Sequence, residues 1–429
     1  MKYIKLSNLI VATAMMLTSM PAFAVGSSGF ENATLSTRSL SRGNAVTANP
    51  EDPSTIAFNP AGLTKLKKTQ AYLGSTVFLT NYSYDGEGIG GRGAEKSSQS
   101  LLVTPYGYVS LPTPIEGLTI GAGANSPFGL VTKYSSVGSQ RHVAFYNELK
   151  TSAYHMSAGY QLLPNLSIGA GGSLVELELK QVGKFNRSIA AGTPNDAVYE
   201  YDVEGQGMGF NLGMLWDITE NDALGVFYRS EVRNHLKGHM STHDLNGTLA
   251  AVFGGLSNVT SADTDLTLPA NITVGYNRRF NSKFDYAVEL SWTDWGAYDV
   301  SKTLFGTSNA ILAGFESIAR DFKDVFSVHT GGSYDFNETW TMNMGYYWQD
   351  MAANPANYTS EIPDGDRHGI TAGFEYRFCK TWSADFNYLI VVSPEVDIAN
   401  AAGNGNSTDI DGSYGSFMQI WSFGLRNEF

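Results

Sequence analysis

The sequence is poor in cysteine, in basic residues and in long apolar runs, and each shortage excludes a class of protein. Its one cysteine, Cys379, cannot form a disulfide within the chain. Cys379 lies in a predicted turn with no neighbouring His or Cys, which argues against a metal ligand or a nucleophile. After residue 24, no run approaches the roughly 20 apolar residues of a transmembrane helix.

Enzyme motifs are scarce as well. The sequence has no P-loop, no G-x-S-x-G, no H-E-x-x-H and no G-x-G-x-x-G that opens a helix. We therefore expect no catalytic residue, no metal site and no cofactor.

The first 24 residues are typical of a secretory signal. They contain two lysines, an apolar run over residues 9–17, and then Ala22-Phe23-Ala24. We expect residues 1–24 to be cleaved and Val25 to begin the mature chain. The remaining chain has 26 basic and 41 acidic residues, which argues against nucleic acid as a partner because phosphate binding needs a basic face.

Most of the mature chain alternates between apolar and polar residues. Over residues 370–378 the even positions are apolar and the odd positions include Thr371, Glu375 and Arg377. A period of two is that of a β-strand, and one apolar and one charged face suit a wall between lipid and a polar lumen. Fourteen segments read this way: 70–83, 100–111, 117–125, 147–162, 165–182, 198–217, 221–238, 265–280, 283–298, 323–336, 339–350, 367–379, 381–392 and 415–429.

The connections between these segments alternate strictly between long and short. Seven long connections would lie at one rim and six short turns at the other, as expected when both chain ends lie on the same side. A soluble β-sandwich would also alternate along each strand, but it does not require this order of connections. The prediction is an all-β fold: a 14-stranded antiparallel transmembrane β-barrel over residues 69–429, in the outer membrane of a Gram-negative-type envelope.

The stretch before the first strand has a different character. Residues 39–63 show no alternation, and Pro50, Pro53 and Pro60 rule out a regular strand. We expect residues 25–68 to form a hatch inside the barrel.

The third strand is interrupted in sequence. Gly121 and Gly123 alternate along it, and Asn125-Ser126-Pro127 follows where the strand should continue. Two interpretations stay open: the strand ends at Asn125, or it kinks and leaves a gap in the wall that protein must cover.

One enzyme hypothesis deserves a test. His155 and Ser157 lie two residues apart on a predicted strand and therefore share a face. They could form the dyad of a barrel phospholipase, or they could be two polar residues that line the lumen. No orienting Asn or acidic residue is evident nearby in the sequence.

Several short motifs together resemble the FadL-type outer-membrane transporters of long-chain fatty acids and other hydrophobic compounds. Their order and their placement on the predicted strands carry the resemblance. They are Gly29-Phe30, Asp52-Pro53-Ser54-Thr55, Asn59-Pro60-Ala61-Gly62-Leu63, Pro127-Phe128-Gly129-Leu130, Leu268-Pro269-Ala270, Trp292-Thr293-Asp294-Trp295 and Ile362-Pro363-Asp364-Gly365-Asp366-Arg367-His368.

The resemblance implies passive, hatch-gated diffusion. A ligand is captured at the outer loops, enters an apolar pocket and leaves sideways through a kinked third strand into outer-membrane lipid. Mapped here, Asn59, Pro60 and Ala61 would face a kink formed by Gly123, Asn125, Ser126, Pro127 and Phe128. Residues 25–30, with Phe30, would reach into the pocket. A monomer is expected.

Ligand contacts are assigned to basic and apolar side chains. Lys133, Arg141 and His142 in the second long loop, or Arg367, could bind a carboxylate, although each could also be an ordinary loop charge. Leu249 and Phe253 belong to an apolar patch in the loop 239–264, which could be a first docking groove or could pack on neighbouring loops. The sequence does not separate fatty acids from alkanes or aromatics, and a general porin for polar solutes is the rival within transport.

Overall fold

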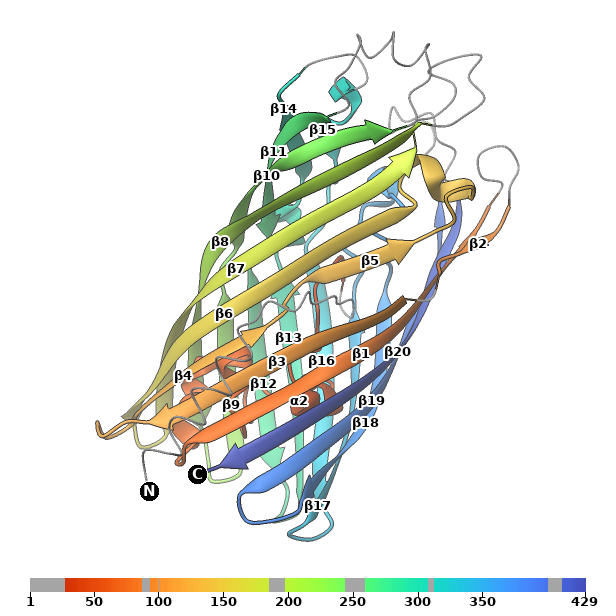
Figure 1. Ribbon diagram of the computed structural model, residues 1–429. Coiled ribbons are helices and arrows are strands. Elements are labelled where there is room, and N and C mark those ends of the chain that lie inside the picture. Colours follow the sequence, from red (N-terminus) through yellow and green to blue (C-terminus); the bar gives the residue numbers. More distant parts are fainter. Residues whose placement is uncertain are drawn as a thin grey trace.

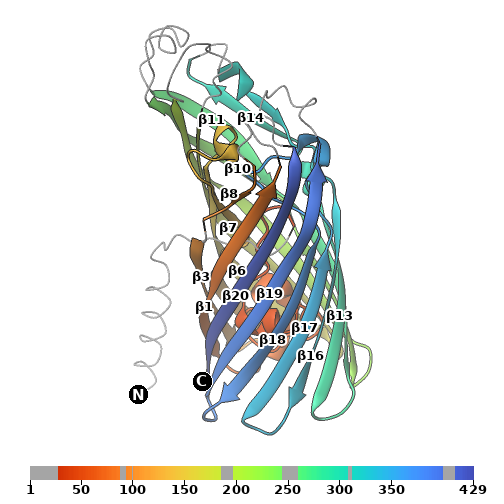
Figure 2. The same cartoon turned by 90° about the vertical axis from the view of Figure 1, so that its right-hand side faces the viewer.

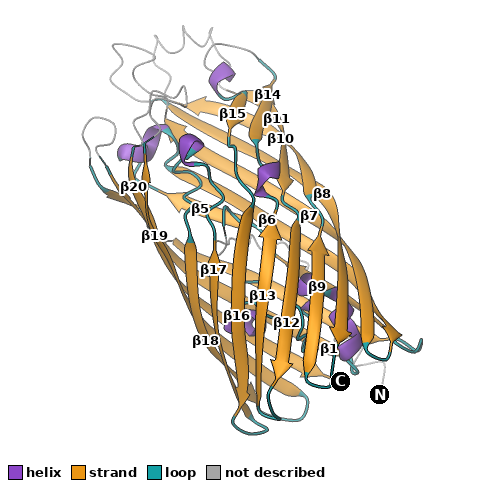
Figure 3. Ribbon diagram, turned by 180° about the vertical axis from the view of Figure 1, so that it is seen from behind, coloured by secondary structure: helices purple, strands orange, loops and turns teal. Residues whose placement is uncertain are grey.

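The computed structural model describes residues 28–86, 93–98, 100–184, 197–243, 259–307, 312–399 and 411–429. These residues form a closed antiparallel β-barrel (Figures 1 and 3), which confirms the predicted fold of fourteen strands. Within the same residues, no helix is long and apolar enough to cross a membrane. The predicted signal peptide and Val25 lie outside the described residues.

Among the described residues the barrel is built from twenty strand segments, because several of the fourteen strands consist of two pieces or carry a short extension. The strands are β1 (Gln70–Asp85), β2 (Glu95–Lys96), β3 (Ser100–Pro112), β4 (Leu118–Asn125), β5 (Gly129–Lys133), β6 (Tyr146–Leu163), β7 (Leu166–Lys184), β8 (Val198–Asp217), β9 (Asp222–Arg229), β10 (Val232–His243), β11 (Val259–Leu268), β12 (Asn271–Arg279), β13 (Phe284–Thr293), β14 (Val300–Phe305), β15 (Ser317–Ala319), β16 (Val325–Asp335), β17 (Trp340–Gln349), β18 (Arg367–Arg377), β19 (Trp382–Ile398) and β20 (Gly412–Glu428).

The barrel closes where the last strand pairs with the first. β20 and β1 pair without a register shift from Gln70–Glu428 to Asp85–Ser413, and β1 pairs with β3 on its other side. The chain's C-terminus lies at the rim with the short turns (Figure 2).

The alternation of residues along the strands has the predicted physical meaning. On β18, Ile370 and Phe374 are 64% and 43% exposed on the outside, whereas Thr371 and Glu375 face inward and are buried. The outer surface is therefore apolar and suits lipid, and the inner surface is polar.

Two predicted strands prove to be interrupted. The predicted strand 221–238 is divided into β9 and β10, where the Ser230 hydroxyl accepts a hydrogen bond from the Phe210 amide in place of regular pairing. The predicted strand 265–280 is divided into β11 and β12 at Pro269, which has no N–H to donate to a ladder.

Residues 28–68, which we call the plug segment, enter the lumen (Figure 2). They contain α2 (Thr37–Ser41), α3 (Thr55–Phe58) and the 3₁₀ helix η1 (Pro60–Lys65). The Ser36 hydroxyl caps α2, and Asn59 caps η1 with Pro60 at its first position, where the missing N–H costs nothing. The helices are short because caps and prolines follow one another closely.

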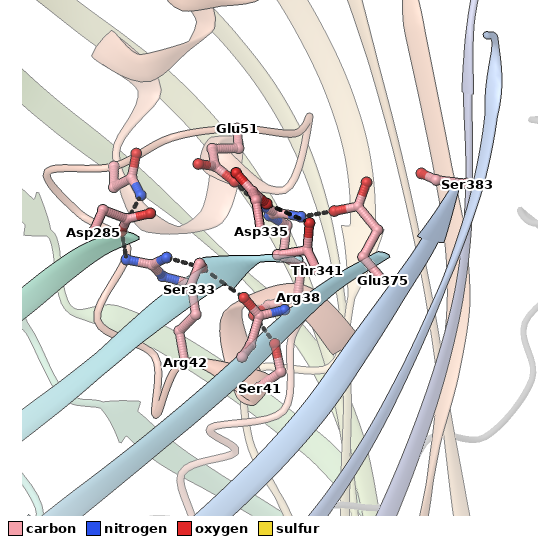
Figure 4. A network of polar contacts seen from close by, with 12 residues as sticks. Arg38, Ser41, Arg42, Glu51, Asp285, Ser333, Asp335, Thr341, Glu375 and Ser383 are labelled. Carbon is pink, nitrogen blue, oxygen red and sulfur yellow. Dashed lines mark hydrogen bonds and ion pairs between the residues drawn. The ribbon is translucent and has the colours of Figure 1, made fainter. Parts of the chain in front are cut away.

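Buried ion pairs fix the middle of the plug segment to the wall (Figure 4). Arg42 pairs with Asp285 of β13 at 2.6 Å and also donates to Ser333 of β16. Arg38 pairs with Glu51 of the plug segment itself and with Glu375 of β18. Each of these charges is largely shielded from water, so each needs its partner.

Replacing Arg42 with alanine should lower the free energy of unfolding by about 3–5 kcal/mol, because the Asp285 carboxylate would stay buried without a cation. Urea unfolding of the purified protein in detergent micelles, followed by tryptophan fluorescence, measures the change.

Arg278→Ala is the matched control. Arg278 also pairs with an aspartate, Asp222, but half of its side chain is exposed and water screens the interaction. Its loss should leave stability nearly unchanged, and equal losses in both variants would contradict an anchoring role for the buried pair.

Candidate functional site: a break in the barrel wall

The third barrel strand stops and restarts. β4 ends at Asn125 and β5 begins at Gly129; we call residues 125–129 the break. β4 pairs with both β3 and β6, whereas β5 pairs with β6 alone. Residues 100–106 of β3 therefore have β1 on one side and, within the described chain, no strand on the other (Figure 1). The third strand thus ends at Asn125 and resumes at Gly129, and both pieces pair with β6.

An apolar cavity of about 630 Å³ lies beside β4, next to the break. Met156 and Met208, which line it, are 77% and 80% exposed on the lipid-facing side, whereas Tyr108 and His155 belong to the inward-facing set. Small residues provide the space, notably Gly107, Ala122, Gly123, Ala124 and Gly172. A Cβ at Gly123 would come within 2.3 Å of the Tyr108 ring, so a larger residue does not fit there.

The start of the plug segment covers the break from within. The Asn32 amide donates to the Pro127 carbonyl at 2.8 Å, and the Gly129 amide donates to the Phe30 carbonyl at 2.8 Å. These two bonds flank a β-bridge between Glu31 and Phe128. Residues 28–35, which we call the covering segment, thus supply hydrogen bonds that a neighbouring strand would otherwise make.

Phe30 fills an aromatic pocket beside the break. Its ring is fully buried and lies 4.8 Å from Trp295, 5.5 Å from Tyr298 and 6.1 Å from Phe128. Burial, together with nearby Asp324, raises the pKa of the Asp294 carboxyl next to this pocket. A hydrophobic ligand that entered here would have to replace the Phe30 ring.

Arg367 and Asp364 hold the backbone just before Phe30. The Asp364 carboxylate accepts a hydrogen bond from the Gly29 amide at 3.0 Å and pairs with Arg367 at 3.2 Å. Arg367 is 1% exposed and also donates to the Gly29 carbonyl at 3.4 Å. Its Nε and Nη1 atoms have no hydrogen-bond partner among the described residues.

The other predicted ligand contacts that the structure describes lie at the end of β5 and in the loop after it. Arg141 and His142 are buried in the 3₁₀ helix η2 (Ser139–His142), where Arg141 donates to the Gly138 carbonyl at 2.8 Å. Lys133 is exposed at the end of β5. Leu249 and Phe253 lie outside the described residues.

The motif Asn59-Pro60-Ala61, which was predicted to face the third-strand kink, lies against several strands of the barrel wall. Asn59 donates to the Thr47 carbonyl at 2.8 Å and to the Met214 carbonyl of β8 at 3.0 Å. The backbone of Pro60 and Ala61 lies so close to Gly169 of β7 that a Cβ there would be 2.3 Å from the Ala61 nitrogen. The motif therefore packs closely on β7 and β8, while the covering segment makes the backbone hydrogen bonds to the break.

The predicted dyad of His155 and Ser157 is not assembled. His155 Nε2 lies 3.2 Å from Asn125 Oδ1, and Asn125 in turn donates to the Tyr108 hydroxyl at 2.8 Å. The buried Ser157 hydroxyl has no hydrogen-bond partner in the described part of the chain. His155 thus belongs to a polar chain at the break and does not activate Ser157.

The family model for outer membrane transport proteins (OMPP1/FadL/TodX) matches residues 18–429. The chain belongs to this family. Its members are outer-membrane transport proteins rather than enzymes.

Relatives and solved structures span nearly the whole chain. A putative outer membrane protein of Neisseria meningitidis is 26% identical over 92% of this chain and 92% of its own length. The long-chain fatty acid transport protein of Escherichia coli O157:H7 is 25% identical, over 88% of this chain and 90% of its own length. A FadL homologue of Pseudomonas aeruginosa has the same fold, with a TM-score of 0.83 and 23% identity over 94% of this chain and 100% of that chain. The Pseudomonas putida toluene transporter TodX shares the fold at a TM-score of 0.69 and 18% identity, over 91% and 97%.

Arg229 also lies at the break, although its sequence context did not indicate a role there. Arg229 Nη2 lies 2.7 Å from Glu31 Oε1, and its guanidinium carbon is 5.0 Å from the centre of the Phe128 ring. Arg229 occupies an inward position like many lumen-lining residues, so nothing in its local sequence indicated this contact.

Gly169→Ala should displace Asn59-Pro60-Ala61, because the new methyl group would overlap the Ala61 backbone. Overpacking of this kind costs about 1–3 kcal/mol. We expect a lower unfolding midpoint in urea and faster cleavage of the plug segment by protease.

Gly172→Ala on the same strand is the control, since its nearest neighbouring atom would be 3.9 Å away. If both variants resist protease equally, close packing at Gly169 does not position the motif.

Proposed function

We propose that this protein transports long-chain fatty acids or similar hydrophobic molecules across the outer membrane by passive, hatch-gated diffusion. The ligand would leave sideways into the membrane lipid through an opening at the third strand. The observation that supports this most is the break between β4 and β5, which leaves residues 100–106 of β3 without a neighbour on that side among the described strands, and whose backbone the covering segment hydrogen-bonds from within. Relatives named as long-chain fatty acid transport proteins and a structure named as a toluene transporter share its family or fold.

A sideways exit suits the energetics of such ligands. Moving apolar surface into water costs roughly 0.8 kcal/mol per CH₂ group, so a long chain would cross a water-filled pore slowly. The apolar cavity next to the break has Met156 and Met208 on its lipid side. It offers a route along which the hydrocarbon chain of the ligand stays out of water.

The moving part of the hatch in this proposal is the covering segment. Arg38 and Arg42 tie α2 to the wall through buried ion pairs, which would all have to separate if the whole plug segment moved. The covering segment is fixed by hydrogen bonds, by the Phe30 ring and by one ion pair, Glu31–Arg229, whose side chains are 16% and 21% exposed. Its release requires no fully buried ion pair to separate. Ligand that replaces Phe30 would therefore open the break without disturbing α2.

Arg367 is the best-placed of the predicted carboxylate ligands. It lies against the Gly29 backbone, and two of its nitrogen atoms have no hydrogen-bond partner among the residues that the structure describes. The site is largely shielded from water, where a charge-assisted bond is strong. Lys133, Arg141 and His142 remain proposals for capture nearer the outer rim, as do Leu249 and Phe253 for first docking. The protein would work as a monomer, with ligand and outer-membrane lipid as its partners.

A disulfide across the Glu31–Phe128 bridge should lock the gate. The two residues form a non-hydrogen-bonded antiparallel pair, whose Cα atoms are typically about 4.5 Å apart, within the range that a disulfide spans. In the variant Glu31→Cys, Phe128→Cys and Cys379→Ser, oxidised cells should take up no radiolabelled oleate, and a reducing agent should restore uptake. Uptake that is the same before and after reduction would rule out the covering segment as the gate; each single-cysteine variant serves as a control.

Conductance separates this proposal from a general porin. Residues 28–66 occupy the lumen, so the protein in a planar bilayer should show no stable ion conductance. A variant without residues 28–66 should conduct ions, which verifies that the barrel itself inserted. Steady open-channel currents from the full protein would favour the porin.

A further inference from the structure

We propose that Glu31 and Arg229 form a carboxylate-exchange latch, in which the carboxylate of the ligand replaces Glu31 on Arg229 and releases the covering segment. The inference rests on the proposed transport function. It adds that an acid opens the break more readily than a neutral molecule of the same length.

The ion pair joins the two sides of the closed seam. Glu31 belongs to the covering segment and its backbone lies opposite Phe128 of the break. Arg229 pairs with Glu31 at 2.7 Å and lies over the Phe128 ring at 5.0 Å, where a cation–π attraction adds to the contact. One guanidinium group thus contacts both the cover and the edge that it covers.

The position of Arg229 leaves it reachable from the lumen. It is the last residue of β9, just before the interruption at Ser230 and Glu231. The Arg229 and Glu31 side chains are 21% and 16% exposed, in contrast to the Arg42 side chain at 1%. A cavity of about 90 Å³ lies beside the pair, lined by both residues and by polar side chains that include Asn32, Asn44 and Thr47. This volume exceeds the roughly 30 Å³ share of one water molecule and can admit a carboxylate group.

The chemistry makes exchange selective. A fatty acid that replaces Glu31 preserves an arginine–carboxylate pair, so the charge on Arg229 never remains uncompensated. A neutral alcohol or hydrocarbon that displaced Glu31 would leave a half-buried cation without an anion, which is unfavourable in a site of low dielectric constant. The Glu31 carboxylate therefore acts as a built-in substitute for the head group of the ligand.

Binding of palmitate and of hexadecanol to the purified protein in detergent tests the latch. The two probes have chains of equal length and differ in the charge of the head group. Isothermal titration should show tighter binding of palmitate to the wild type. Palmitate should also speed hydrogen exchange at residues 28–35, and hexadecanol should do so less.

Single substitutions test the roles of Glu31 and Arg229 separately. Glu31→Gln removes the internal competitor and should tighten palmitate binding about tenfold while leaving hexadecanol binding within about twofold. Arg229→Gln should remove the preference for palmitate over hexadecanol. Asp217→Asn is the control, because it breaks the Lys65–Asp217 pair, which also joins the plug segment to the wall but lies at β8 away from the break.

The outcomes separate the latch from the transport proposal. Equal binding of both probes to the wild type, with no change in Glu31→Gln, would overturn the latch and leave lateral transport standing. Failure of both probes to bind at all would overturn the transport proposal and the latch together. If Arg229→Gln does not fold, the Glu31→Gln result alone decides.

Discussion

A wall in contact with lipid must satisfy every backbone hydrogen bond from within the protein, and this requirement governs the arrangement at the third strand. β5 pairs with β6 but not with β3, so the backbone of the break needs another hydrogen-bond partner. The covering segment supplies it through the backbone of Phe30 and Asn32. The opening in the wall and the segment that closes it are therefore one structural unit, although about 95 residues separate them in sequence.

The division between fixed and movable parts follows from where charge is buried. α2 carries Arg38 and Arg42, whose partners lie on β18 and β13, and such pairs are expensive to separate once they are shielded from water. The covering segment instead combines one partly exposed ion pair, a ring in an aromatic pocket and hydrogen bonds between uncharged groups. The plug segment thus combines a firmly anchored part, α2, with a more weakly attached part, the covering segment.

The alternation of apolar and polar residues, together with the regular order of long and short connections, was enough to predict the barrel. It also marked residues 125–127 as an irregularity of the third strand, since Pro127 cannot donate to a ladder, but it left open whether the strand ends there or kinks. It did not reveal the division at Ser230 or the partner of Asn59-Pro60-Ala61. Those features depend on which inward side chains meet across the lumen, and a residue such as Arg229 has the same local pattern as any other lumen-lining position. The family resemblance supplied the motif but not its contacts in this chain.

The short spacing between Phe30 and α2 has a consequence for affinity. Six residues separate Phe30 from Thr37, where the anchored helix begins. A side chain held on so short a tether competes for its pocket at an effective concentration in about the millimolar range. The observed affinity for any ligand is then the intrinsic affinity of the pocket divided by the strength of this tethered competitor. Ligand affinity in such a protein can be tuned through the length and stiffness of the tether, without any change in the pocket itself.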